Sequence, residues 1–211
     1  MEPWFEAVAA GDVERVRALL AEDPSRLTAG DENSVSALRT RATGAMPRSS
    51  ICSSPRAPLD LYDAAAIGDT EVLRDLLDAD PDGLDRPSPD GFTALHVAAY
   101  YGEVKASELL LNRGADAEVV SQNELKVRPL NSAAAGGHHV VVHLLLDRGV
   151  DVDAAMAGGF TPLHATANNR DAATARLLIE RGADPHAITD DGRSVVDVAS
   201  HDPSFTESLN G

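Results

Sequence analysis

Histidines are the side chains of this 211-residue chain that come closest to forming a chemically active group. Three of the 7 histidines are neighbours in sequence, namely His138, His139 and His143. His139 and His143 are four residues apart, so on a helix their imidazoles would share one face, as zinc ligands can. No cysteine or carboxylate accompanies them at a recognised ligand spacing. We therefore expect surface or helix-packing histidines, and keep a metal-binding protein that uses these three as an alternative.

The other reactive side chains do not form a catalytic set either. The one cysteine, Cys52, has no base near it in the sequence. It cannot form a disulfide within the chain, which fits the reducing cytoplasm. The glycines do not follow the strand-to-helix spacing of a phosphate-binding loop, and the carboxylates are spread as on a solvated surface. We predict a protein that is not an enzyme, with no catalytic residue, no cofactor and no resident metal.

The charge of the chain argues against two classes of partner. Its formal net charge is −16 at pH 7, and such a surface repels both nucleic-acid phosphates and anionic lipids. The richest apolar run, Val140–Leu146, is far shorter than the roughly 20 residues that a membrane-spanning helix needs. The first residues, Met1–Trp4, show neither the basic nor the apolar part of a signal peptide. We expect a cytoplasmic protein that binds neither nucleic acid nor membranes.

Short motifs recur along the chain at a fixed interval. The tetrapeptide Thr93–His96 returns as Arg128–Asn131, Thr161–His164 and Ser194–Asp197. The intervals between their third residues are 35 residues and then 33 residues twice. A constant period in this range is typical of a stacked array of repeats.

These motifs resemble the ankyrin repeat, and the resemblance covers nearly the whole chain. It implies an all-α solenoid of stacked helix-turn-helix units with finger loops, forming a single domain over residues 1–211. It also implies that His96 and His164 make structural hydrogen bonds to a neighbouring loop. The units are expected at about residues 4–30, 58–88, 90–120, 124–156 and 158–189, with a C-terminal cap at 191–209.

The residue types explain how one such unit folds. Thr161 is a suitable N-cap for the first helix, and Pro162 suits its first helical position. Pairs of alanines let neighbouring first helices approach closely. The second helix carries a triplet of apolar residues for the core, and a glycine in the left-handed conformation ends it. The triplets are Leu109–Leu111, Leu144–Leu146 and Leu177–Ile179, and the glycines are Gly114, Gly149 and Gly182.

One stretch departs from this pattern. Residues 39–55 have no helical period and are rich in serine, arginine and proline, although Ser36–Leu38 stands where the repeat motif is expected. We predict that residues 39–55 are irregular. We favour an out-of-frame remnant of a further unit over a natural insertion, and the nucleotide sequence distinguishes the two.

The resemblance implies a protein-interaction scaffold or adaptor, expected to be monomeric, that binds a protein partner through its concave face. An alternative is a regulatory or inhibitory subunit of an enzyme. The variable positions of each unit are the residue before the repeated tetrapeptide and the two residues after the paired alanines. The expected partner-binding residues there are Phe92, Tyr100, Tyr101, Phe160, Asn168 and Asn169. Arg86 and Asp90 join them from the finger before Phe92, and Ala135 and Gly136 hold the same positions in the unit that follows Tyr101.

Aromatic residues concentrate at these positions. The chain has 4 Phe, 3 Tyr and 1 Trp, and four of them are Phe92, Tyr100, Tyr101 and Phe160. Aromatic side chains anchor interfaces because they bury much area with few rotatable bonds. We expect a groove centred on Tyr100, Tyr101 and Phe160, rimmed by acidic residues, that accepts a neutral or basic segment. The competing interpretations are that Phe92 and Phe160 pack finger against finger, and that Tyr100 and Tyr101 pack in the core.

Overall fold

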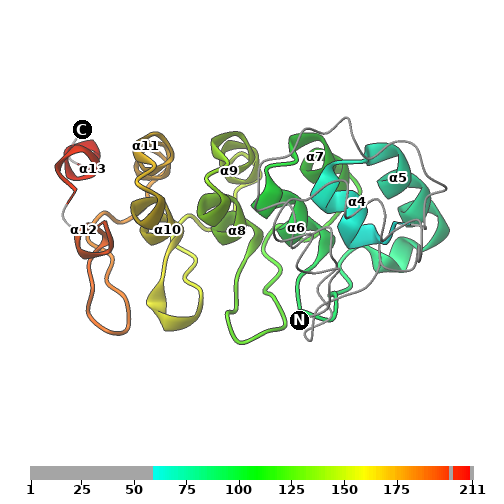
Figure 1. Ribbon diagram of the computed structural model, residues 1–211, viewed down its shortest axis with the longest axis horizontal. Helices are drawn as coiled ribbons and strands as arrows, with labels where there is room; N and C mark the ends of the chain where they lie inside the picture. Colours follow the sequence, from blue (N-terminus) through cyan, green and yellow to red (C-terminus); the bar gives the residue numbers. More distant parts are fainter. Residues whose placement is uncertain (1–58, 200–201, 210–211) are drawn as a thin grey trace, which may run out of the picture.

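The chain folds into a row of helix pairs joined by finger loops (Figure 1). This computed structural model describes residues 59–199 and 202–209, so the unit expected at 4–30, Cys52 and the stretch 39–55 lie outside the described residues.

Figure 1 shows three tiers: second helices, first helices, and then finger loops. The first helices are α4 (Leu61–Ile67), α6 (Ala94–Tyr101), α8 (Pro129–Gly136), α10 (Pro162–Asn169) and α12 (Val195–Val198). The second helices are α5 (Thr70–Ala79), α7 (Val104–Asn112), α9 (His139–Leu146), α11 (Ala172–Glu180) and α13 (Pro203–Ser208), and short 3-10 turns lie at Pro81–Gly83 and Ala157–Gly159.

This arrangement confirms the predicted all-α stack with finger loops. The helix ends follow from local sequence. Pro129 and Pro162 occupy the first turn of α8 and α10, where a missing N–H costs nothing. Gly102 and Gly137 end α6 and α8 with a φ of 72°, in the left-handed conformation that glycine adopts without strain. Arg170 stands at the same place after α10 with a φ of 56°. None of the described helices is both long and apolar enough to cross a bilayer.

The core is a continuous double row of leucines. The first helices contribute Leu95, Leu130 and Leu163, and the middle leucines of the second-helix triplets are Leu110, Leu145 and Leu178, all of them fully buried. The first member of two triplets, Leu109 and Leu144, is only half-buried. Each unit therefore buries apolar side chains between its own two helices and against the neighbouring units, as expected of a solenoid.

Successive first helices pack closely because small residues face one another. Ala98, Ala99, Ala133 and Ala134 are completely buried between α6 and α8. A Cβ atom added to Gly136 would lie 2.3 Å from the carbonyl oxygen of Tyr100, far inside van der Waals contact. Gly136, expected from the sequence to face a partner, is thus required for packing.

The finger loops are joined to one another by backbone hydrogen bonds. The N–H of Gln122 donates to the carbonyl oxygen of Gly91 at 2.8 Å, and that of Asp190 donates to Gly158 at 2.9 Å. Between them, the N–H of Ala157 donates to the carbonyl oxygen of Leu125 at 2.9 Å. The fingers therefore form one connected row beneath the first helices.

Carboxylates add a second set of links between units. Side chains of Asp85 and Glu118 accept the backbone N–H groups of Asp116 and Asp151, at 3.1 and 2.5 Å. Asp153 accepts the backbone N–H of Asp184 in the same way, at 3.0 Å. Part of the acidity of the chain is thus structural.

Leu110→Ala and Leu145→Ala should each lower the free energy of unfolding by about 2–5 kcal/mol, because each removes a completely buried side chain from a close-packed row. The control is Val140→Ala on α9, where the side chain is 59% exposed and the change should stay within about 0.5 kcal/mol. Urea unfolding followed by circular dichroism measures both. Equal midpoints for Leu145→Ala and Val140→Ala would contradict this register.

Candidate functional site

His96 and His164 are buried parts of the fold rather than reactive groups. Nδ1 of His96 accepts the backbone N–H of Thr93 at 3.2 Å, so the ring proton is on Nε2. Nε2 then donates to the carbonyl oxygen of Val127, at 2.9 Å, on the finger of the next unit. His164 accepts the N–H of Thr161 with the same geometry, at 3.2 Å. The hydrogen bond to a neighbouring loop expected from the family resemblance is present at His96.

Asn131, in the unit between those of His96 and His164, makes the same pair of hydrogen bonds with its side-chain amide. Oδ1 of Asn131 accepts the backbone N–H of Arg128 at 3.1 Å, and Nδ2 donates to the carbonyl oxygen of Ala154 at 3.0 Å. An amide therefore reproduces the neutral imidazole, with one acceptor and one donor on opposite sides.

Both histidines are held neutral. Burial lowers the pKa of His96, although its hydrogen bonds to the carbonyl groups of Val127 and Val119 partly oppose that shift. Burial also lowers the pKa of His164. Its Nε2 has no acceptor with hydrogen-bond geometry, yet the carbonyl groups of Arg193 and Ala187 lie near enough to oppose the shift in part. Neither ring faces solvent, so neither is placed for acid–base chemistry on a ligand.

The sequence-adjacent histidines make separate contacts. Nδ1 of His143 lies 3.0 Å from a carboxylate oxygen of Asp147, and its Nε2 lies 3.2 Å from Arg181. His139 lies 3.4 Å from the Thr174 hydroxyl. His138 packs against Gly102, where an added Cβ would meet its ring at 2.3 Å. Within the described residues, no three side chains of histidine, cysteine or carboxylate type are grouped to hold a metal ion.

The two phenylalanines pack on the buried histidines. The rings of Phe92 and His96 have centroids 5.8 Å apart, and those of Phe160 and His164 are 5.7 Å apart. The guanidinium carbon of Arg193 also lies 5.1 Å from the centroid of Phe160. Both phenylalanines are half-buried. Phe92 packs against the core, and Phe160 connects its finger to the first helix and keeps part of its ring accessible.

Tyr100 and Tyr101 form an aromatic pair at the C-terminal end of α6. Their ring centroids are 5.2 Å apart and the planes meet at 81°, an edge-to-face contact. Tyr100 is 42% exposed and Tyr101 is half-buried. Tyr100 is thus a large, braced aromatic side chain open to a partner.

The asparagines at the same end of α10 differ from each other. Asn169 donates to the carbonyl oxygens of Ala134 and Ala135, at 3.1 and 2.8 Å, and so ties α10 to the end of α8. Asn168 is exposed, as is Ala135 on α8. Tyr100, Ala135 and Asn168 therefore occupy corresponding positions at the ends of three successive first helices.

The expected groove centred on the tyrosines and Phe160 is not one cluster. Tyr100 and Tyr101 lie at the C-terminal end of α6, whereas Phe160 precedes the N-terminus of α10, and α8 lies between the two helices (Figure 1). Aligning the repeats places each residue within its unit, but it carries no information on the distance across the array. The structure therefore places the two tyrosines at the end of α6, which we call the tyrosine end, and Phe160 in a separate finger before α10.

The two remaining candidates stabilise the first described finger. Arg86 pairs with Asp80 at 2.6 Å, and its carbonyl oxygen accepts the Tyr62 hydroxyl at 2.9 Å. The carbonyl oxygen of Asp90 accepts the side-chain amide of Asn123 at 2.9 Å, and its carboxylate accepts the Ser88 hydroxyl. Both residues still present surface to solvent.

Charge is uneven between the tiers. Within residues 59–199, three of the four basic side chains of the finger loops are paired with a carboxylate. Arg86 contacts Asp80, Arg193 lies 2.9 Å from Asp191, and Nε of Arg128 lies 3.1 Å from Glu118 without hydrogen-bond geometry. The fourth is Lys126. The loops carry many more carboxylates, which are Asp82, Asp85, Asp90, Asp116, Glu118, Glu124, Asp151, Asp153, Asp184, Asp190 and Asp191. The finger side therefore presents a strongly negative surface.

The chain is similar to one family of proteins with a known repeat and to several longer proteins. Residues 61–156 and 119–190 match the family model described as ankyrin repeats (3 copies). The Probable E3 ubiquitin-protein ligase XBOS31 of Oryza sativa subsp. japonica is 40% identical over 102 residues, and Neurogenic locus notch homolog protein 1 of Danio rerio is 37% identical over 107. The E3 ubiquitin-protein ligase KEG of Arabidopsis thaliana is 32% identical over 139 residues. These matches take in 48%, 50% and 64% of this chain but only 22%, 4% and 8% of the three relatives.

The buried histidines should make stability fall in mild acid. Their pKa values are lowered in the folded state, so below about pH 6.5 the unfolded chain binds protons that the folded chain does not. The free energy of unfolding should then decrease as the pH falls below that value. In the double variant His96→Asn with His164→Asn, which introduces the amide that the fold already uses at Asn131, the loss between about pH 7 and about pH 5 should be smaller than in the wild type.

The control is His139→Asn, which removes an exposed imidazole and leaves both buried ones in place. Urea midpoints at each pH give the comparison. Parallel curves for the wild type and the double variant would show that the two buried imidazoles are not the cause.

Proposed function

Because the chain belongs to the ankyrin-repeat family, whose arrays generally act as protein–protein interaction modules, we propose that it is a non-enzymatic adaptor. It binds a segment of a partner protein through the first-helix and finger-loop side of the array. The sites closest to a partner are the exposed ends of α6, α8 and α10 and the fingers that precede them. We also propose that it acts in the cytoplasm as a monomer.

The observation that carries this proposal is the exposed Tyr100, which packs edge-to-face against the half-buried Tyr101. Tyr100 keeps 42% of its surface accessible although Tyr101 supports it edge-on. A rigid aromatic side chain loses little conformational entropy on binding, which is why such residues dominate interface energies. Ala135, at the corresponding position of α8, is also exposed and has only a methyl side chain.

Charge indicates the class of the partner. Carboxylates greatly outnumber basic side chains in the finger loops, and all three of their arginines are paired. A partner segment with lysine or arginine is attracted to this surface, and an acidic segment is repelled. A neutral or basic segment therefore fits the first-helix and finger side.

Two of the relatives are named as ubiquitin ligases, but the matches cover small parts of their lengths. We propose that this chain shares a protein-binding array with them and not ligation. The second candidate function is that of a regulatory or inhibitory subunit of an enzyme. Such a subunit would bind its partner through the same surface, and the bound segment would lie at the active site of the enzyme.

The double change Tyr100→Ala with Tyr101→Ala should weaken binding at least tenfold, about 1.4 kcal/mol, while leaving the helix content intact. The partner is first captured from the host and identified by mass spectrometry. It is then purified, and its affinity for the wild type and the variant is measured by calorimetry.

The matched control is Ile188→Ala, which shortens a 66% exposed aliphatic side chain in the last finger. It should change the affinity less than twofold if the tyrosine end dominates. Unchanged affinity of the tyrosine variant would place the interface elsewhere. Lost helicity would instead assign both tyrosines to the core.

A further inference from the structure

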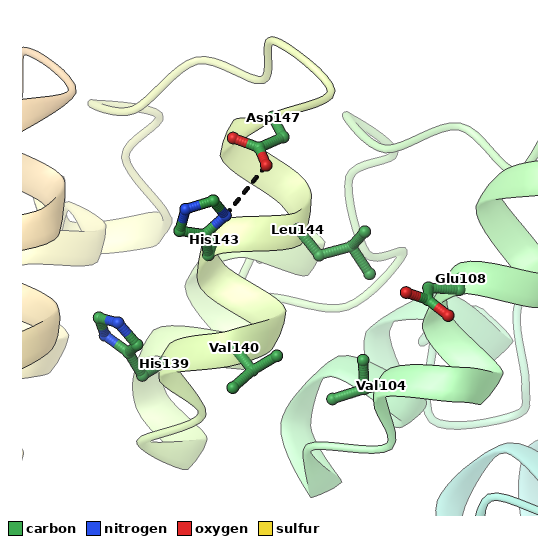
Figure 2. Close-up of a pocket in the computed structure, with 7 residues that line it drawn as sticks. All are labelled: Val104, Glu108, His139, Val140, His143, Leu144 and Asp147. Carbon is green, nitrogen blue, oxygen red and sulfur yellow. Dashed lines mark ion pairs between the residues drawn. The ribbon is translucent and has the colours of Figure 1, made fainter.

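A groove on the second-helix tier is separate from the proposed partner surface. It lies between α7 and α9, on the side of the array away from the fingers (Figures 1 and 2). Its volume is about 360 Å³. The residues that line it are Val104, Glu108, His139, Val140, His143, Leu144 and Asp147.

Val140 is an apolar side chain that the fold does not use. It is 59% exposed, although its neighbours Val141 and Val142 are completely buried. The other large exposed apolar residues within the described part of the chain, Tyr100, Val120, Leu125 and Ile188, lie at the end of α6 or in finger loops. Valine is also a poor helix former at an exposed site. Neither core packing nor helix stability explains Val140.

The corresponding positions of three other second helices carry no large aliphatic residue. Alignment on the turn between the two helices places Glu71, Lys105 and Ala173 where α9 has Val140. These residues suit a solvated helix face. The array therefore tolerates a charged residue at this position, and the valine distinguishes one unit.

The groove stays open because no side chain is seen to bridge it among the described residues. Between α9 and α11, Arg181 reaches Asp147 at 3.0 Å and His143 at 3.2 Å. Between α7 and α9, Arg148 reaches Asn112 at 2.8 Å, beyond the end of the groove. Figure 2 shows Val140 and Leu144 pointing from α9 toward α7, with Val104 and Glu108 on the facing helix. His139, which also lines the groove, lies on the side of α9 away from α7, so the groove continues over the outer face of that helix.

The α7 rim of the groove carries an exposed carboxylate. Glu108 is exposed and has no ion-pair partner among the residues that the structure describes. On the opposite rim, Asp147 contacts His143 and Arg181. An incoming cation would therefore find an available carboxylate at Glu108, next to an aliphatic floor. The net charge of −16 favours the approach of the same class of ligand.

We propose that this groove is a second docking site, and that its occupant is a short amphipathic helix of a basic partner protein. Val140 and Leu144 are one helical turn apart, so apolar residues at positions i and i+4 of the ligand can pack on them and on Val104. A lysine or arginine beside them pairs with Glu108. The adaptor then holds two partners on opposite tiers of one array.

A defined peptide tests this site. The probe is a synthetic helix of about three turns with leucine at i and i+4 and lysine on both flanks, and its matched peptide has glutamate in place of lysine. Binding to the full chain is measured by fluorescence anisotropy, and the site is mapped by methyl NMR. The lysine peptide should saturate with shifts at Val104, Val140 and Leu144, and the glutamate peptide should bind at least tenfold more weakly.

Two pairs of variants locate the contact. Val140→Lys should weaken binding at least tenfold, whereas Ala173→Lys, which adds the same charge at the corresponding position of α11, should change it less than twofold. Glu108→Gln should weaken binding and flatten its salt dependence, with Glu180→Gln as the control. The Tyr100→Ala with Tyr101→Ala variant should bind this peptide as the wild type does, which separates this site from the first-helix and finger side.

Several results would overturn the proposal. They are an absence of saturable binding, equal binding of the two peptides, and equal losses in Val140→Lys and Ala173→Lys. A concentration-dependent sedimentation coefficient that Val140→Lys abolishes would assign the groove to a second copy of this chain, and so would also overturn it.

Discussion

The close approach of successive first helices is the constraint on which the rest of the structure depends. Gly136 lies against the carbonyl group of Tyr100, where even one added carbon would stand 2.3 Å away, and buried alanines fill the rest of the contact. This spacing aligns the leucine rows of neighbouring units and brings each finger within hydrogen-bonding distance of the next. It also places the ends of α6, α8 and α10 side by side (Figure 1), which turns three separate helix ends into one extended surface.

Polar groups complete the contact between units and limit what can serve a partner. His96 and Asn131 both span from their own helix start to the following loop, one with an imidazole and one with an amide. Asp85, Glu118 and Asp153 use their carboxylates on backbone N–H groups of the next unit. Some of the carboxylates that make the finger surface negative therefore serve to hydrogen-bond one unit to the next. The remaining carboxylates, with the exposed tyrosine, carry the binding function that we propose.

The repeat period and the buried leucines could be predicted from sequence because each depends on one unit and its nearest neighbours. Tyr100 could be placed on the surface of its unit for the same reason. Three features could not be predicted. Asn169 turns back onto α8, Arg170 adopts a left-handed conformation where α6 and α8 end in glycine, and Val140 borders an open groove. The contact of Asn169 and the groove at Val140 depend on the adjacent unit, and a motif aligned within one unit contains no such information. The conformation of Arg170 is set within its own unit, where it caps α10 without the glycine that marks this turn after α6 and α8.

Hydrogen exchange with and without the captured partner tests most directly whether the first-helix and finger side is the interface. We expect binding to slow exchange at the C-terminal end of α6, around Tyr100 and Tyr101, and in the finger at 115–128. Exchange in the second helices α7, α9 and α11 should not change, because a segment bound on the first-helix and finger side does not reach that tier. Protection confined to the second-helix tier, or no protection in the finger and α6, would contradict this assignment of the interface.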